Sequence, residues 1–213
     1  MKRLARITGY ALGVLLVAAL CNAALPSPVW AQTSASRAFG IAVTTPVTNV
    51  VSPVAQLPGD GSMATDNTPN VSVDGFAGAD NLFAMATGGD RSAESNSTLE
   101  NISLLNGLVT ANSVVAMASS WLTDLGAGSG ADGSQLANLV VNGVSYTSDV
   151  AANTRVNLPG VGYVVLNEQQ RTGDGITSSG VTVNMIHVVL VDALTGAKTG
   201  DIIVGSATSQ VSR

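Results

Sequence analysis

Short apolar segments alternate with turn-forming residues along the chain from Gln32 onwards, with a turn about every ten positions. Val and Thr are common in these segments, whereas Lys and Glu are scarce. A helix around 114–118 is the alternative there, but the better strand formers beside it and Gly107 favour strands. The pattern therefore predicts strands at 37–44, 49–56, 101–119 (one strand or two), 136–141, 144–147, 161–169, 181–192 and 201–210.

The connections between these segments indicate an antiparallel arrangement. Asn142-Gly143 lies between two apolar segments, which is the strongest short-range signal for a hairpin. No repeat of 20 to 50 residues is present, which argues against a solenoid. We therefore expect an all-β fold, a mostly antiparallel sandwich or open barrel.

The N-terminal half looks less regular. Between residues 58 and 100 the chain is rich in Gly, Asp, Asn, Ser and Thr and has few apolar anchors. We expect long polar loops at 58–80 and 87–98, with the second the most mobile part of the molecule.

Residues 1–31 have the pattern of a signal helix that is removed on export. A basic start with Lys2, Arg3 and Arg6 precedes an apolar stretch at 11–20, and Ala31 is a suitable residue for cleavage. A retained membrane anchor is the alternative, but polar and proline residues follow too soon for a span of about 20 apolar residues. A second alternative is a lipoprotein modified at Cys21. We predict cleavage after Ala31, a single β-domain at 32–213, and no membrane span thereafter.

The charge of the exported part limits its partners. Three of the nine basic residues leave with the signal, so six remain against fourteen acidic residues, a net charge of −8 with neutral histidine. This charge repels phosphate backbones, so we expect no nucleic-acid partner. The single cysteine lies in the signal, which leaves neither a disulfide nor a thiol nucleophile.

Six sequence blocks, in a fixed order, carry a family resemblance. They are LLNGLVTA at 104–111, LVVNG at 139–143, NTRVNLPGVG at 153–162, LNEQ at 166–169, His187, and GDIIVGSA at 200–207. In this stretch the chain resembles the bacterial choice-of-anchor P family. The resemblance implies an exported β-rich domain at the cell surface, with no established reaction or catalytic residue. After Arg213 no sorting motif or apolar tail follows, so we expect release or noncovalent retention.

Glu168 and His187 are the most plausible acid–base residues in the chain. If 161–169 and 181–191 form a hairpin with its loop centred near Asp174, about six residues separate Glu168 from His187 along the sheet. At about 3.3 Å per residue this is about 20 Å, which excludes a catalytic dyad.

Each of these two residues therefore receives a structural interpretation. In the same register His187 lies opposite Gly162, and we expect its ring to pack over Gly162 and Gly205. Glu168 lies between Asn167 and Gln169, where a carboxylate at a strand end can accept hydrogen bonds from loop amides. A hydrolase that uses Glu168 is an alternative that requires a second acid–base group within about 5 to 9 Å.

Metal and glycan sites are further alternatives. One histidine without a cysteine cannot form a structural zinc site. Calcium suits the oxygen-rich loops of an exported protein, and the candidates are Asp60, Asp66, Asp132 and Asp174. Trp121 and Tyr146 would support a glycan-binding surface if they clustered with these aspartates.

The sequence favours a non-catalytic structural, matrix or adhesive domain that is secreted or held at the cell surface. Its expected partners are cell-surface or matrix components. Self-association through a sheet edge is a further hypothesis, based on the Val- and Ile-containing segment 201–210.

Overall fold

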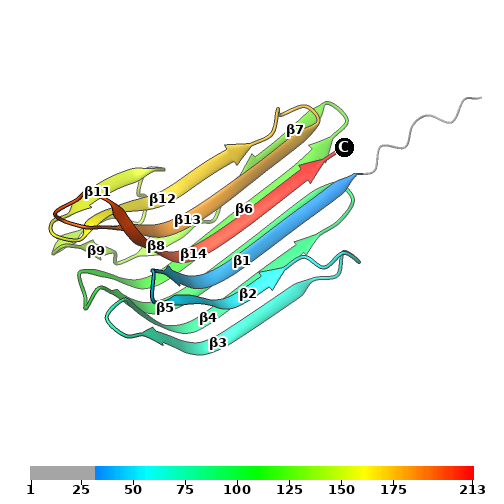
Figure 1. Ribbon diagram of the computed structural model, residues 1–213. Helices are drawn as coiled ribbons and strands as arrows, with labels where there is room; N and C mark the ends of the chain where they lie inside the picture. The colour runs from blue at the N-terminus through cyan, green and yellow to red at the C-terminus, as the bar shows by residue number, and fades with distance from the viewer. Residues whose placement is uncertain (1–31) are drawn as a thin grey trace, which may run out of the picture. The chain divides into compact units, whose positions relative to one another are not determined.

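The computed structural model describes residues 32–213, which form two antiparallel sheets packed face to face (Figure 1). Within these residues no helix is long and apolar enough to cross a membrane. The predicted signal helix lies outside the described residues. The all-β sandwich prediction is confirmed, and the sheets do not close into a barrel.

Sheet A has six strands in the order β11-β12-β13-β14-β1-β2. Their bounds are Thr33–Thr44 (β1), Asn49–Gln56 (β2), Thr154–Leu158 (β11), Gly162–Thr172 (β12), Ser178–Val191 (β13) and Lys198–Ser212 (β14). The predictions for 49–56 and for the C-terminal strands are confirmed, with ends that differ by a few residues.

Sheet B has the order β10-β9-β6-β5-β4-β3, and β7 and β8 also pair with β6. Its strands are Ala64–Val73 (β3), Ala77–Gly88 (β4), Ser92–Leu104 (β5), Val109–Thr123 (β6), Gly126–Gly130 (β7), Gln135–Ala137 (β8), Val140–Val141 (β9) and Val144–Ser145 (β10). The hairpin across Asn142-Gly143 is confirmed, because it joins β9 to β10.

The predicted loops between residues 58 and 100 are wrong, because this region contains β3, β4 and β5. In β5, Ala93, Ser95, Ser97 and Leu99 are buried and alternate with residues that are more exposed. Small and polar residues have low strand propensity, but paired neighbours and burial of one face compensate for it. The prediction failed because it required large apolar residues at these inward positions.

The core lies between the two sheets. Large side chains such as Leu99, Leu104, Ile186 and Ile202 fill most of it. A second part contains small residues alone, with Ala38 and Ala84 among its members.

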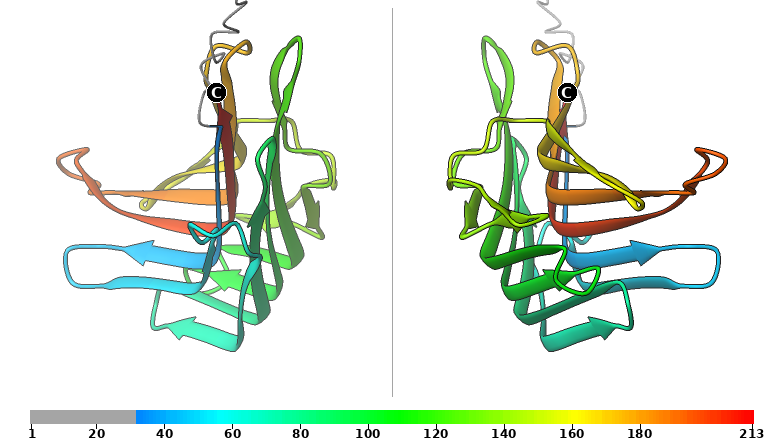
Figure 2. Two further views of the ribbon diagram at one scale, coloured as in Figure 1. Left: turned by 90° about the vertical axis from the view of Figure 1, so that its right-hand side faces the viewer. Right: turned by 90° about the vertical axis from the view of Figure 1, so that its left-hand side faces the viewer.

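Both sheets bend sharply in the same direction, with sheet A on the inner side of the bend (Figure 2). In sheet A the regular pairing is interrupted on a line that crosses Asn167, Met185, Gly205 and Gly40. Asn167 and Gly205 have φ angles of 49° and 65°. A Cβ atom on Gly205 would lie 2.6 Å from Val114 Cγ1, so this position needs glycine for both conformation and space.

The bend in sheet B follows the same principle with asparagine. Asn81 and Asn101 have φ angles of 49° and 51°, and the β4–β5 register shifts beside Asn81. Asparagine tolerates the left-handed region better than most residues. We call the face of sheet A that points away from sheet B the inner face and the face of sheet B that points away from sheet A the outer face.

The C-terminal strand β14 lies in the middle of sheet A, paired with β13 on one side and β1 on the other. Self-association through the edge of 201–210 is therefore wrong. The edge strands β2 and β3 each contain a proline, Pro53 and Pro69. Proline cannot donate a ladder hydrogen bond, so it hinders pairing of a further strand there.

Candidate functional site

His187 lies between two carboxylates on the inner face of sheet A. Its Nδ1 atom is 2.9 Å from Glu168 Oε2, and its Nε2 atom is 3.0 Å from Asp201 Oδ1. The three side chains are 14 to 22% exposed. We call this group the histidine clamp.

The predicted geometry of Glu168 and His187 is wrong, since the two side chains are in contact. Strands β12 and β13 pair three residues further along than expected, so that Glu168 lies opposite Asn184. The neighbours of His187 are Val165 and Ile203, which replace the predicted contacts with two glycines.

The bend brings the clamp together. Met185 and Ile186 are consecutive and both buried in the core. Regular strands alternate faces, so this irregularity lets Asn184 and His187 both project from the inner face. Glu168 projects from the same face on the other side of the bend, and the fold of the sheet closes the distance.

Additional hydrogen bonds hold Glu168 in place. Asn184 Nδ2 donates to Glu168 Oε2 over 2.7 Å, and Gln170 Nε2 donates to Oε1 over 3.3 Å. The Ser206 hydroxyl donates in turn to Asn184 Oδ1 over 2.8 Å. Asn184 and Ser206 are almost fully buried. The carboxylate is therefore satisfied from three side chains.

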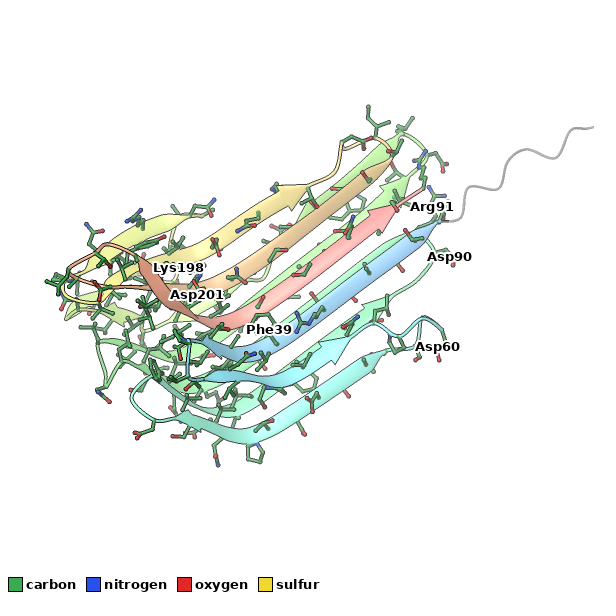
Figure 3. The ribbon with its side chains drawn as sticks, in the orientation of Figure 1. Phe39, Asp60, Asp90, Arg91, Lys198 and Asp201 are labelled. Carbon is green, nitrogen blue, oxygen red and sulfur yellow. The ribbon has the colours of Figure 1, made fainter. Side chains whose placement is uncertain are left out.

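Asp201 has its own second partner. Lys198 Nζ lies 2.6 Å from Asp201 Oδ2, and the two residues lie close together at the start of β14 (Figure 3). The clamp thus joins three neighbouring strands, with Glu168 on β12, His187 on β13 and Asp201 on β14.

The electrostatics favour a protonated histidine. The hydrogen bond from His187 lowers the pKa of Glu168 from 4.5 to about 2, against the opposing effect of burial. The same bond to Glu168, followed by that to Asp201, raises the pKa of His187 above its ordinary 6.5, although burial opposes the rise. An imidazolium can donate from both ring nitrogens at once, whereas neutral histidine can donate from only one.

This arrangement leaves little chemistry available to the clamp. Both ring nitrogens are occupied, so His187 has no free atom with which to accept a substrate proton. The nearest hydroxyl in the network, on Ser206, donates to Asn184 and not to the histidine. Within residues 32–213, no group of three or more acidic, histidine or cysteine side chains is arranged to hold a metal ion.

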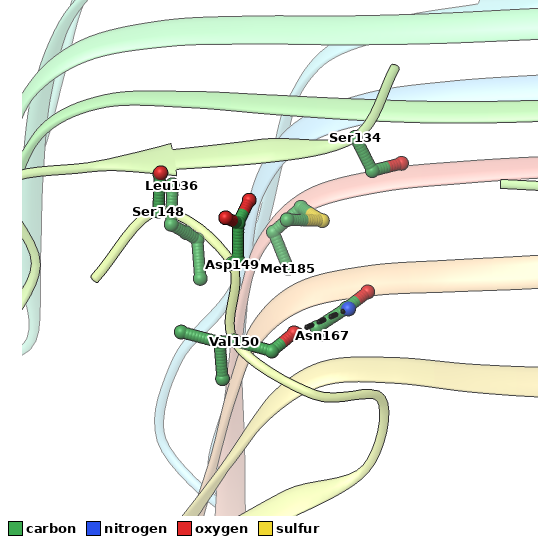
Figure 4. A pocket seen from close by; sticks show the side chains of 7 residues that line it. All are labelled: Ser134, Leu136, Ser148, Asp149, Val150, Asn167 and Met185. Carbon is green, nitrogen blue, oxygen red and sulfur yellow. Dashed lines mark hydrogen bonds between the residues drawn. The ribbon is translucent and has the colours of Figure 1, made fainter. Parts of the chain in front are cut away.

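The residues on either side of Glu168, Asn167 and Gln169, use their side-chain amides in local hydrogen bonds. Asn167 Nδ2 donates to the carbonyl oxygen of Val150, and Gln169 Nε2 donates to Asn167 Oδ1. Asn167 also lines a cavity of about 230 Å³ (Figure 4). The other lining residues are Ser134, Leu136, Ser148, Asp149, Val150 and Met185. Glu168 and His187 do not line this cavity.

The structure does not bring Trp121 and Tyr146 together. Trp121 is 43% exposed near the end of β6, where its ring lies against Gly128 of β7. Tyr146 packs against the core and donates its backbone amide to Leu139. The segment of Tyr146 joins sheet B near Val109, at the opposite end of β6. These residues form no common aromatic platform.

The four aspartates proposed for calcium are also dispersed. Asp60, Asp132 and Asp174 lie in three different turns, and Asp66 lies on β3, where it accepts a hydrogen bond from the amide of Val54. The hydrogen bond from the Thr177 hydroxyl, followed by those from three backbone amides, lowers the pKa of Asp174. Its carboxylate thereby organises the β12–β13 turn.

Sequence reasoning missed Asp201, Asn184, Ser206 and Lys198. Of these four, Asp201 had the clearest signal in the sequence, because it is a charged residue directly before the apolar run 202–204. Such a residue needs a partner once its strand is buried. Comparison with protein families, curated proteins and solved structures finds no significant match.

Proposed function

We propose that this chain is a non-catalytic structural or adhesive domain that acts outside the cytoplasm. The observation that supports it is the histidine clamp, because the best acid–base residues of the chain are bonded to each other. Their contacts stabilise a bend across three strands, which is a structural role. The pattern of residues 1–31 and the resemblance to the choice-of-anchor P family support export to the cell surface.

The positions of the two ends of the sandwich support attachment from one side. Thr33 at the start of β1 lies opposite Ser212 at the end of β14 (Figure 1). The two ends of the described chain therefore lie at the same end of the sandwich. The turns that join β1 to β2 and β13 to β14 lie at the other end, where Val47 and Leu194 are highly exposed.

This geometry favours a pendant domain over a link that carries load in series. A force between the two ends would separate β1 from β14 one hydrogen bond at a time, since the strands are antiparallel neighbours. A domain held at one end, in contrast, presents its far turns and its two outward sheet faces to the surroundings.

The hydrolase alternative predicts a different outcome in one experiment. The purified chain 32–213 is incubated with labelled bacterial envelopes, and both the bound protein and the soluble fragments are measured. A structural or adhesive domain binds to the envelopes and releases no fragments, and Glu168→Gln binds as the parent chain does. The exposed variant Asp90→Asn is the matched control. Fragment release that Glu168→Gln abolishes would establish the hydrolase instead.

A further inference from the structure

Charge is distributed unequally between the two sheets. Residues 64–145, which form sheet B, contain eight acidic residues and one basic residue, Arg91. The inner face of sheet A carries four of the seven positive charges of residues 32–213, with protonated His187 counted. The clamp and its surroundings there include Arg37, Arg155, His187 and Lys198 against Glu168 and Asp201, a net charge of +2 with protonated His187.

Two of these cations have no acidic partner within residues 32–213. Arg37 is exposed and lies 5.4 Å from the ring centre of Phe39, and Arg155 lies 3.7 Å from the ring centre of Tyr163. Each therefore rests on an aromatic ring with its charge available to another molecule. Beside Arg37, the inner face is apolar across β14, β1 and β2, through Phe39, Ala42, Val51, Val54 and Ile203.

The outer face of sheet B has the complementary character. Asp80 and Glu100 lie directly opposite each other on β4 and β5, next to the bend, and both are exposed. Like charges in this position repel each other, and within residues 32–213 the only side chains that donate to them are those of Asn101 and Asn81. No cation within the described chain neutralises this pair.

Apolar residues accompany these acids, as they accompany the cations on the inner face. Phe83 and Met85 on β4 and Val115 and Met117 on β6 lie on the outer face, on either side of Thr98 and Asn96 of β5. All four are partly or fully exposed, and Met117 is 37% exposed. The two faces are therefore complementary in charge, and each also carries apolar side chains.

We propose that copies of this chain stack on one another, with the inner face of one copy on the outer face of the next. Both sheets bend in the same direction (Figure 2), so a translated copy places its convex bend in the concave bend of its neighbour. Strand β1 packs over β4 and β5 within the sandwich. A translation of this kind places Arg37 of one copy near Glu94 of the next. Both residues lie on the same side of the bend, in the part of the sandwich that holds the chain ends.

The size of the inner face is sufficient for a stable contact. Five strands at about 4.8 Å spacing and about ten residues at about 3.3 Å each give roughly 800 Å². A standard interface buries about that area on each partner. Because the two faces differ, the contact is heterologous and does not close on itself, so it extends into an open stack. This inference deepens the proposed structural role and rests on it.

Charge reversal tests the stack in solution. Chain 32–213 is examined by sedimentation velocity over a range of concentrations, in EDTA, at low and high salt (about 0.02 M and about 0.5 M). We expect the parent chain to form species that grow with concentration at low salt and dissociate at high salt. Arg37→Glu and Glu94→Lys each remove one charge contact at exposed positions and should weaken association about tenfold or more.

Combinations of the variants identify the geometry. An equimolar mixture of Arg37→Glu and Glu94→Lys should stack again with the two variants in alternation, because one contact keeps the original charge pair and the next combines the two reversed charges. The double variant should stack again. A parent chain that is monomeric under all conditions, or a mixture that associates no more than either variant alone, would overturn the stack. Either result leaves the proposed function standing, because envelope binding without fragment release is measured separately. Thermal unfolding of each variant verifies that it is folded.

Discussion

Replacement of Glu168 by Gln should destabilise the protein most strongly between pH 4.5 and 6.5. The pKa of Glu168 is lowered from 4.5 to about 2. At about 1.4 kcal/mol per unit, this shift corresponds to about 3 kcal/mol of folding stability at neutral pH. The carboxylate is 14% exposed, and water screens part of the interaction. We therefore expect a loss of about 2 kcal/mol, or about 4 to 8 °C in Tm for a domain of this size.

The pH dependence follows from the signs of the two shifts. The stability from Glu168, whose folded pKa is lowered, is present above pH 4.5 and is lost as the pH falls through about 2. The stability from His187, whose folded pKa is raised, is present below pH 6.5 and is lost as the pH rises through the raised value. Both contributions to the folding stability are therefore complete only between pH 4.5 and 6.5.

Urea unfolding of the parent chain and Glu168→Gln at pH 2, 5.5 and 9 measures the effect. The difference in unfolding free energy should be largest at pH 5.5 and smallest at pH 2. Asp90→Asn, in the exposed turn between β4 and β5, is the matched control and should change stability by less than about 0.5 kcal/mol at each pH. Equal destabilisation at pH 2 and 5.5 would refute the reasoning, because the loss would then not depend on the charge.

Three further predictions concern the bend, the core and metal binding. Gly205→Ala should lower the free energy of unfolding by at least about 3 kcal/mol, because it combines a positive φ with a Cβ atom 2.6 Å from Val114. Gly143→Ala, with a positive φ in open space, should lower it by about 1 kcal/mol. Denaturant unfolding compares the two variants, and equal losses would show that crowding is unimportant. Ser97 Oγ is buried without a hydrogen-bond partner in residues 32–213, so Ser97→Ala should be neutral or stabilising by up to about 1 kcal/mol. Ser95→Ala loses a hydrogen bond of 2.9 Å and should lower the free energy of unfolding by about 1 kcal/mol. A Ser95→Ala variant that is more stable than Ser97→Ala would contradict the hydrogen-bond assignment. Thermal unfolding in EDTA and in millimolar calcium should give the same Tm, whereas a rise of several degrees with calcium would reveal a site that the dispersed aspartates do not suggest.

The sequence was informative where the strand signal is local. Asn142-Gly143 specified a hairpin through the conformational preferences of two adjacent residues, and 49–56 contained enough branched apolar residues to identify β2. The region 58–100 was misread because its strands bury alanine and serine, whose propensities point elsewhere. Their strand conformation comes from pairing with neighbours distant in sequence, which no local pattern records.

The histidine clamp could not be predicted from residue types alone. Its partners meet because β12 and β13 pair three residues beyond the expected register and because the sheet bends at Asn167 and Gly205. A shift of one residue in a strand moves a side chain to the other face of the sheet, so small irregularities decide which residues meet. The chemical suitability of Glu168 and His187 for a pair was evident, and the geometry was not.

The protonation of His187 tests the central claim most directly, namely that the acid–base residues of this chain are committed to its structure. His187 is the only histidine in the chain, so its ring nitrogens give unambiguous NMR signals. The account predicts that both nitrogens carry slowly exchanging protons at pH 6.5 and that the ring titrates above that value. A ring that titrates at or below pH 6.5, with one nitrogen unprotonated and in free exchange at neutral pH, would contradict the clamp and return His187 to the candidates for catalysis.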